Sequence, residues 1–420
     1  MDLNESRSDL KFSKLLLTLI VLLFTFTACQ ESTTDKVEVP SDEEITEAVQ
    51  SQFSTSAAVP EEDINVQTKD GIVTINGSTT NLLAKNKATE LAQKVHGALS
   101  VVNNLKISTE RPDDIIETDI TRALATDPAT EPLEISVGVQ NGLVTLKGAV
   151  DSWQEKQLAG TIAKGVKGVK ELNNTIIVNP QPTRSEEDIK YEIEQTLKMN
   201  SEIRNAKIDV QVDSNRVTLS GAVGSAYEKQ LAADYSHVVG VDSVVADELE
   251  VHPEFRSDLL QNNELDVLTD EEISNAIRNA LTYDPRVPED KIGISINEDV
   301  ATLSGTVNNL NAKLAAESDA RNTAGVKAVE NNIAVEKKVL VDPEVPVTDE
   351  AIQTRIGLAI ERDPYLEDVN VSISVNEGYA VLEGEVDSQF KKKQIEEVAS
   401  NVKGVLAIKN NISVIESTET

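Results

Sequence analysis

The segment TLKGAV, Thr145–Val150, recurs with small changes at four other places in the 420-residue chain. The other copies are TINGST from Thr74, TLSGAV from Thr218, TLSGTV from Thr302 and VLEGEV from Val381. A segment that recurs at long intervals indicates a repeated structural unit rather than a single motif. The sequence therefore predicts five copies of one unit.

Two glycines mark each copy, and the second follows the first by 19 or 20 residues every time. The first glycines are Gly77, Gly148, Gly221, Gly305 and Gly384, and the second are Gly97, Gly168, Gly240, Gly325 and Gly404. The distance between copies varies from 71 to 84 residues, which is longer and more elastic than a solenoid repeat. We therefore expect separate small domains joined by linkers. We call them modules 1 to 5, with bounds at 41–108, 112–179, 184–252, 269–336 and 348–415, and 253–268 as the longest linker.

Each module begins with a predicted amphipathic helix, seen most clearly in module 4. Thr269 and Glu272 have the spacing of a capping box, and apolar residues from Ile273 to Leu281 recur with helical spacing. Asp284 precedes a proline, which disfavours the helical conformation and predicts the end of the helix.

A period of two follows the helix, as in Ile292, Ile294 and Ile296, and predicts a strand with one buried face. KDGI, QNGL and NEGY then predict tight hairpin turns in modules 1, 2 and 5. Modules 3 and 4 have DSNR and NEDV there, so we expect differently built turns. A second helix fills the interval between the two glycines, and the second glycine is predicted at its C′ position.

The complete order is αββαβ, with a final strand after the second glycine. A helical crossover between the second and third strands favours a parallel pair beside the antiparallel hairpin. The predicted fold class is α+β: five tandem small domains, each a three-stranded mixed sheet with two helices on one face.

These residues resemble the BON domain, the bacterial osmotic-stress and nodulation module. The resemblance rests on the early helix, the hairpin ending in a glycine, the second helix with a Lys or Arg, and paired asparagines before the last strand. Four modules carry these pairs, at Asn103 and Asn104, Asn173 and Asn174, Asn331 and Asn332, and Asn410 and Asn411, whereas module 3 has Ala246 and Asp247. The resemblance implies a non-enzymatic envelope protein without a cofactor that binds phospholipid surfaces under osmotic or envelope stress. The ten glycines and the asparagines are interpreted as turn and cap residues.

The N-terminal residues have the pattern of an export signal. LLLTLIVLLFTFTA is shorter than a membrane span and ends directly before Cys29, the only cysteine of the chain. FTAC resembles a lipoprotein processing site, although Phe26 stands where leucine is usual. We expect a signal peptide at 1–28, a lipid on Cys29 and a tether at 29–40, with an uncleaved anchor as the alternative. The expected location is the periplasmic side of a membrane, with the outer membrane favoured.

Charge limits the choice of partners. The formal net charge of -33 disfavours nucleic acid, and we expect none to bind. The densest basic stretch follows the only tryptophan and gives a candidate lipid contact: Trp153, Lys156, Lys164, Lys167 and Lys170. A hydrophobic staple at the helix entry and dispersed surface lysines are the alternatives.

No motif for catalysis is found. The three histidines are scattered, and no His or Cys spacing is typical of a metal site. Two classes of function remain: a lipid-anchored protein whose modules contact phospholipid headgroups, and a tethered scaffold that binds envelope proteins, for example through sheet edges.

Overall fold

The computed structural model describes residues 39–59, 64–131, 133–179, 184–203, 206–253, 268–288, 292–336 and 348–415. Residues from Val39 onward form one compact unit. Cys29, the predicted signal peptide and nearly all of the tether and of the 253–268 linker lie outside the described residues. None of the helices within the described ranges combines the length and the apolar character needed to cross a bilayer.

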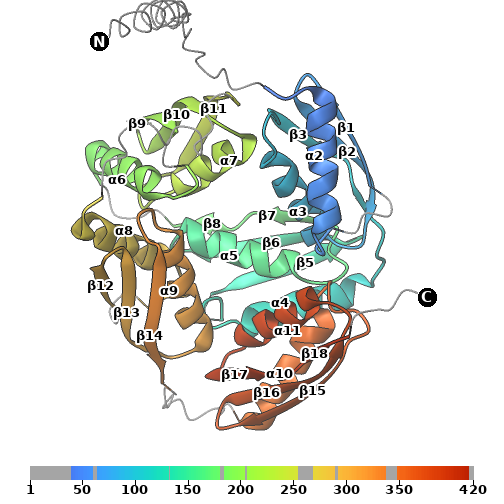
Figure 1. Ribbon diagram of the computed structural model, residues 1–420. Helices are drawn as coiled ribbons and strands as arrows, with labels where there is room; N and C mark the ends of the chain where they lie inside the picture. The colour runs from blue at the N-terminus through green and yellow to red at the C-terminus, as the bar shows by residue number, and fades with distance from the viewer. Residues whose placement is uncertain are drawn as a thin grey trace, which may run out of the picture. The chain divides into compact units, whose positions relative to one another are not determined.

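The elements follow the predicted order in every module (Figure 1). Module 1 contains α2 (Asp42–Thr55), β1 (Ile64–Lys69), β2 (Ile72–Thr79), α3 (Leu82–Gln93), β3 (Ser100–Asn103) and β4 (Lys106–Ile107). Module 2 contains α4 (Asp113–Thr126), β5 (Ile135–Gln140), β6 (Leu143–Val150), α5 (Trp153–Lys164), β7 (Glu171–Asn174) and β8 (Ile177–Val178). Module 3 contains α6 (Glu186–Met199), β9 (Lys207–Asp213), β10 (Arg216–Val223), α7 (Ala226–Tyr235) and β11 (Ser243–Val251). Module 4 contains α8 (Asp270–Tyr283), β12 (Ile292–Asn297), β13 (Val300–Val307), α9 (Leu310–Asn322) and β14 (Ala328–Val335). Module 5 contains α10 (Asp349–Arg362), β15 (Asn370–Asn376), β16 (Tyr379–Val386), α11 (Gln389–Ser400), β17 (Ala407–Asn410) and β18 (Ser413–Val414).

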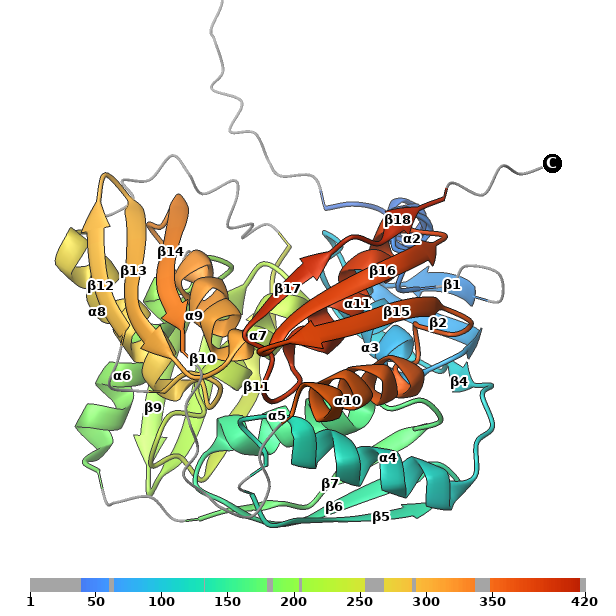
Figure 2. The same ribbon diagram turned by 90° about the horizontal axis from the view of Figure 1, so that it is seen from below.

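The sheet topology confirms the predicted α+β fold. In module 2 the central strand β6 pairs antiparallel with β5 and parallel with β7 and β8. Figure 2 shows α4 and α5 on the same side of this sheet. The other modules repeat the arrangement, with one continuous last strand in modules 3 and 4.

Each module has a hydrophobic core of its own between the helices and the sheet. In module 2, Ile116 and Ile120 of α4 lie against Val144 and Leu146 of β6, and none of the four side chains is exposed. Alternation along the strands and helical spacing on α4 place these residues on facing surfaces. Burial of one such side chain stabilises the fold by roughly 1.5–3 kcal/mol.

All five hairpin turns have the same backbone form, so the expectation of different turns in modules 3 and 4 is wrong. Ser214 and Asn215 have φ of 50° and 63°, and Glu298 and Asp299 have 50° and 64°, beside 54° and 77° in the Asn141–Gly142 turn. Asn and Asp tolerate this left-handed region better than other residues with a side chain. In four modules the side chain of the first residue of the first helix also accepts a hydrogen bond from the main chain of this turn. Asp113, for example, accepts hydrogen bonds from the main-chain N–H groups of Asn141 and Gly142 at 2.7 and 2.9 Å, and Glu186 accepts one from Ser214 at 2.8 Å.

All ten predicted glycines have positive φ, and two of them show why no side chain is present. A Cβ on Gly148 would lie 2.5 Å from the carbonyl oxygen of Glu134, and a Cβ on Gly168 would lie 2.8 Å from Cβ of Arg111. The second glycine does not occupy C′ as predicted, because α5 ends at Lys164 and the chain makes a further turn before Gly168. This turn brings the chain onto the start of α4.

Candidate functional site

The predicted lipid-contact residues are held by α5 and by the turn that follows it. Ser152 caps the helix and forms a capping box with Glu155, so Trp153 is the first residue of α5. Trp153 and the four lysines are all partly buried rather than fully exposed. Each of these five side chains therefore has neighbours within the protein, and these contacts limit how far it is available to an external ligand.

Trp153 stacks on a histidine from module 3. The rings of Trp153 and His237 lie with centroids 3.8 Å apart and planes inclined by 7°. Gln154 Nε2 donates to the His237 carbonyl at 3.3 Å, and Nδ1 of His237 lies 2.9 Å from the carbonyl oxygen of Ala233. Burial lowers the pKa of His237. Two backbone hydrogen bonds oppose this shift, and the Lys156 ammonium adds to it. The stack therefore involves a neutral imidazole at neutral pH.

The four lysines have different neighbours. The Lys156 ammonium lies 5.6 Å from the Trp153 ring centroid. Lys164 lies near Asp234 of module 3 and counteracts the rise that burial causes in the pKa of that carboxyl. Lys167 forms a 2.5 Å ion pair with Glu367 of module 5, and Lys170 packs over the hairpin turn of its own module. The structure thus brings Trp153, Lys156 and Lys164 to the contact with module 3 and separates Lys167 and Lys170 from them.

The start of the second helix is a contact position in modules 1, 3 and 4 as well. Tyr227 of module 3 hydrogen bonds to Glu202 at 3.1 Å, and Lys94 of module 1 lies 4.0 Å from its ring centroid. Leu82 of module 1 belongs to the buried cluster of module 2, and Leu310 of module 4 packs on the core of module 5. Four modules therefore use the first or second residue of this helix to contact another module, which no periodicity of the sequence indicates.

A second group of ionisable residues lies where modules 2, 4 and 5 approach one another. Arg286 donates to Asp284 from Nε at 2.9 and 3.1 Å. Burial raises the pKa of Asp127 in module 2 and of Glu397 in module 5, and the charge of Arg286 partly offsets both rises. Burial, together with the charge of Asp284, raises the pKa of Asp319 well above its usual range. Perturbed carboxyl groups of this kind occur in active sites and also in structural ion-pair networks.

Asp363, the C-cap residue of α10, is a further buried acid, and only 6% of its surface is exposed. Burial raises its pKa to about 6. Hydrogen bonds from Gln394 at 3.0 Å and from the Tyr365 main-chain N–H at 2.9 Å oppose this rise. Sequence reasoning identified Asp363 only as the end of a helix, because its burial arises from packing that the sequence pattern does not show.

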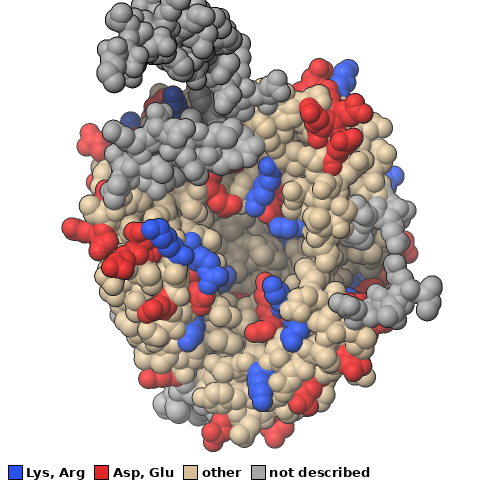
Figure 3. Space-filling model, viewed as in Figure 1, with Lys and Arg blue, Asp and Glu red and all other residues tan. Residues whose placement is uncertain are grey.

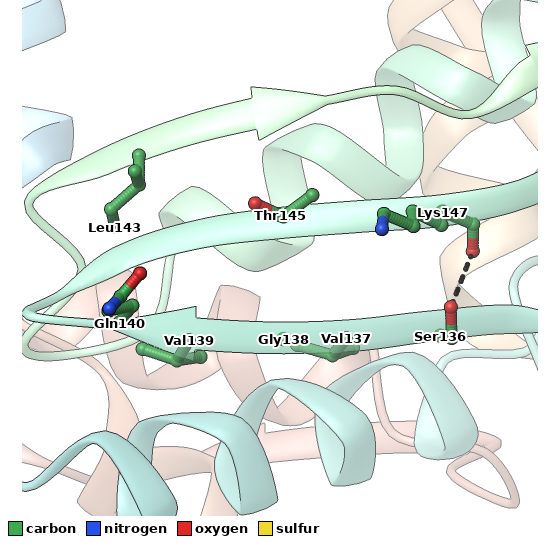
Figure 4. A pocket seen from close by; sticks show the side chains of 8 residues that line it. All are labelled: Ser136, Val137, Gly138, Val139, Gln140, Leu143, Thr145 and Lys147. Carbon is green, nitrogen blue, oxygen red and sulfur yellow. Dashed lines mark hydrogen bonds between the residues drawn. The ribbon is translucent and has the colours of Figure 1, made fainter.

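Two hollows on the described surface are wide open to solvent. One, of about 390 Å³, lies over the outer face of the module 2 sheet (Figure 4). Lys147 is its only charged lining residue, and the Ser136 hydroxyl donates to the Lys147 carbonyl at 3.2 Å. Among the residues that the structure describes, no group of three or more His, Cys, Asp or Glu side chains could hold a metal ion.

Comparison with known proteins agrees with the repeated fold. The family model of the BON domain matches residues 41–109, 112–180, 185–253, 269–337 and 348–416. Over 143 residues the chain is 27% identical to osmotically-inducible protein Y of Escherichia coli (strain K12), covering 32% of this chain and 71% of that protein.

Two further similarities are more limited. An uncharacterised protein in the gshII 5′ region of Anaplasma centrale is 32% identical over 114 residues, covering 27% of this chain and 75% of that protein. The C-terminal domain of CdsD, a structural protein of the type III secretion system of Chlamydia trachomatis, is 18% identical with a TM-score of 0.15. That alignment covers 54% of this chain and all of the CdsD chain.

Proposed function

The chain belongs to the BON domain family, and from this premise we propose that it is an exported, lipid-anchored protein of the cell envelope. In this proposal Cys29 carries the anchor, the protein faces the periplasm, most simply from the outer membrane, and the modules contact phospholipid headgroups. It supports the envelope under osmotic stress and performs no catalysis. The similarity to osmotically-inducible protein Y supports the connection to osmotic stress.

The distribution of charge is the observation that carries the phospholipid contact. On the face seen in Figure 3, basic side chains gather around a central hollow, whereas acidic side chains predominate towards the edge. The net charge of -33 repels an anionic bilayer at long range, but screening limits this repulsion to about 8–10 Å at ordinary salt. Close to a membrane, lysines such as Lys156 and Lys164 can therefore interact with phosphate groups.

Sedimentation with phospholipid vesicles tests the proposal. The chain from Gln30 onward is mixed with neutral vesicles and with vesicles that contain anionic lipid, at low and high salt. We expect binding to anionic vesicles that weakens as salt rises. Lys156→Gln combined with Lys164→Gln should weaken binding several-fold. The matched control is Lys190→Gln with Lys198→Gln in α6, which changes the net charge equally and should leave binding unchanged.

A second pair of variants asks whether Trp153 itself enters the membrane. Trp153→Ala removes both the indole and the stack, whereas His237→Ala removes only the stack. If the indole enters the headgroup layer, Trp153→Ala weakens vesicle binding and His237→Ala does not. Equal losses in the two variants would show that the stack matters only for the contact between modules.

The alternative is a tethered scaffold that binds envelope proteins without direct lipid contact. The outer face of the module 2 sheet favours this alternative, because the open hollow of Figure 4 is lined there by polar residues such as Gln140 and Thr145. Absence of binding to every vesicle composition, with the modules folded, would favour the scaffold over the lipid-binding protein.

A further inference from the structure

Three of the five first helices end in an aspartate whose side chain is buried. Asp127, Asp284 and Asp363 are the C-cap residues of α4, α8 and α10. Asp127 and Asp363 are each 6% exposed, and the side chain of Asp284 is 9% exposed. The free carbonyl groups at the end of a helix carry a partial negative charge, so an ionised carboxylate is disfavoured there. Each of these aspartates therefore depends on compensating hydrogen bonds, on a cation or on a proton.

In module 4 a single arginine lies beside two carboxyl groups. Arg286 donates from Nε and Nη2 to the carboxylate of Asp284, and its main-chain N–H donates to Oδ1 of the same residue at 2.8 Å. Asp319 of α9 is the second acid, and the charge of Asp284 acts on it directly. Its Oδ2 is buried and has no hydrogen-bond partner among the described residues, and none of the ion pairs described involves it. The contacts of Arg286 are thus made to Asp284, and Asp319 is left without an ion pair.

The neighbouring modules add further acidic groups around this carboxyl pair. Tyr235 of module 3 faces Asp319, since burial and then the charge of that carboxyl raise the pKa of the tyrosine. Asp127 of module 2 and Glu397 of module 5 lie within reach of the Arg286 charge. One arginine is therefore shared among several carboxyl groups, and an ionised Asp319 adds to an excess of negative charge.

Asp319 lies on a helix that contacts other modules at both of its ends. The N–H of Leu310, the first residue of α9, donates to the Val405 carbonyl of module 5 at 3.3 Å. The N–H of Ala324, directly after the helix, donates to the Met199 carbonyl of module 3 at 2.8 Å. The Met199 side chain belongs to the buried cluster of module 4, and Leu310 packs on the core of module 5. A displacement of α9 would therefore break the contacts of module 4 with both neighbours.

We propose that a proton shared by Asp284 and Asp319 holds module 4 against modules 3 and 5, and that loss of this proton at higher pH releases these contacts. One proton removes the repulsion between two carboxyl groups that have a single arginine beside them. Once the proton leaves, the second charge is best accommodated in water, and α9 must move away from its neighbours to let water in. Such a switch acts on the contacts between modules, so it does not depend on whether they bind lipid or protein.

The direction of the pH dependence follows from the burial of the pair. Burial, and then the charge of Asp284, raises the pKa of Asp319 while α9 is in place. A raised pKa gives a stabilisation that is complete below the ordinary aspartate pKa of about 3.9 and is lost as the pH rises through the raised value. The contacts of module 4 should therefore be tightest in acid and should weaken progressively as the pH rises.

Amide hydrogen exchange of the lipid-free chain from Gln30 onward tests the proposal, because this chain retains the whole compact unit of five modules. Exchange is followed at Leu310 and Ala324, whose N–H groups donate across the two contacts. Asp319→Asn is measured beside the wild type at acidic and at alkaline pH, so that the intrinsic pH dependence of exchange cancels. We expect the protection of the wild type relative to this variant to fall at least about tenfold from acid to alkali, as one unit of pKa shift would give.

Two further variants make the test specific. Asp284→Asn leaves a single acid of the pair beside Arg286 and should remove the pH dependence as Asp319→Asn does. If circular dichroism shows that one of these two variants does not fold, the other serves as the reference. Glu330→Gln is the matched control, because Glu330 is an exposed acid on β14 of the same module, and it should retain the pH dependence of the wild type.

Three results would overturn the inference. The first is a protection ratio between the wild type and Asp319→Asn that is the same at both pH values. The second is a loss of the pH dependence in Glu330→Gln as well. The third is an equal change at the amides of α2 in module 1, which would indicate unfolding of the whole chain. A pH-dependent ratio at Leu310 and Ala324 that the aspartate variants abolish and the control retains, with α2 unaffected, supports it.

Discussion

The side-chain amide of Asn174 donates a hydrogen bond to the main-chain carbonyl of Lys156 at 2.8 Å, and so ties the last strand of module 2 to α5. Its Oδ1 accepts from the main-chain N–H of Ile176 at 3.3 Å. The same pair of contacts is made by Asn103, Asn331 and Asn410 in their modules. The asparagine of the family pattern therefore bridges strand and helix, and the predicted structural role of this residue follows from its contacts.

Removal of this bridge should destabilise module 2. Asn174→Ala leaves the Lys156 carbonyl and the Ile176 N–H without their partner, and such a loss typically costs about 1–3 kcal/mol. Trp153 is the only tryptophan, so its fluorescence during urea unfolding reports on module 2 and on its contact with module 3. Asn173→Ala is the matched control, because Asn173 is exposed, and it should change stability by less than about 0.5 kcal/mol. Equal effects of the two substitutions would contradict the bridge.

Gly168→Ala should also destabilise module 2, and Gly138→Ala should not. Gly168 has φ of 93°, and an added Cβ would lie 2.8 Å from Cβ of Arg111 and 3.0 Å from Cδ1 of Ile116. Backbone strain of this kind costs on the order of 1–3 kcal/mol, to which the steric conflict adds. Gly138 in β5 has no atom within 4 Å of an added Cβ, and alanine there should be neutral or slightly stabilising. Urea unfolding followed by Trp153 fluorescence measures both variants.

Local signals predicted the modules well and their contacts poorly. The elements were identified from three local signals: the recurring segment around the first glycine, the capping box at Thr269 and the Asp–Pro pairs. These signals suffice because hydrogen-bonding partners within a helix or hairpin are close in sequence. The turns of modules 3 and 4 were misjudged, because Asn215 and Asp299 adopt positive φ without glycine. Trp153 and the lysines were singled out by residue type alone. Neither His237 nor Glu367 was expected beside them, since contacts between modules leave no periodic pattern in the chain.

The stack of Trp153 on His237 should weaken in acid. Burial lowers the pKa of His237, so the folded protein binds this proton less readily than the unfolded chain does. The stabilisation that this histidine gives is therefore present above the ordinary histidine pKa of about 6.5 and is lost as the pH falls below it. We expect acrylamide to quench Trp153 fluorescence more strongly at acidic than at alkaline pH. His237→Ala should show strong quenching at both, and pH dependence that persists in this variant would assign the titration to another group.

Asp363 should make module 5 less stable as the pH rises from acidic to neutral. Its pKa is raised from 3.8 to about 6 in the folded protein, so folding is linked to proton uptake between these values. The stabilisation is complete below the unfolded pKa and is lost as the pH passes the folded pKa, and a shift of about two units corresponds to at most ~3 kcal/mol.

Asp363→Asn mimics the protonated acid, so its stability relative to the wild type should rise between acidic and neutral pH. Amide hydrogen exchange in β15 and β16, two strands of the module 5 sheet, measures this difference at each pH. Asp387→Asn is the control, because the hydrogen bond from Lys391 lowers the pKa of that exposed carboxyl and reverses the sign. A constant difference between Asp363→Asn and the wild type at all pH values would show that the buried carboxyl does not take up the proton.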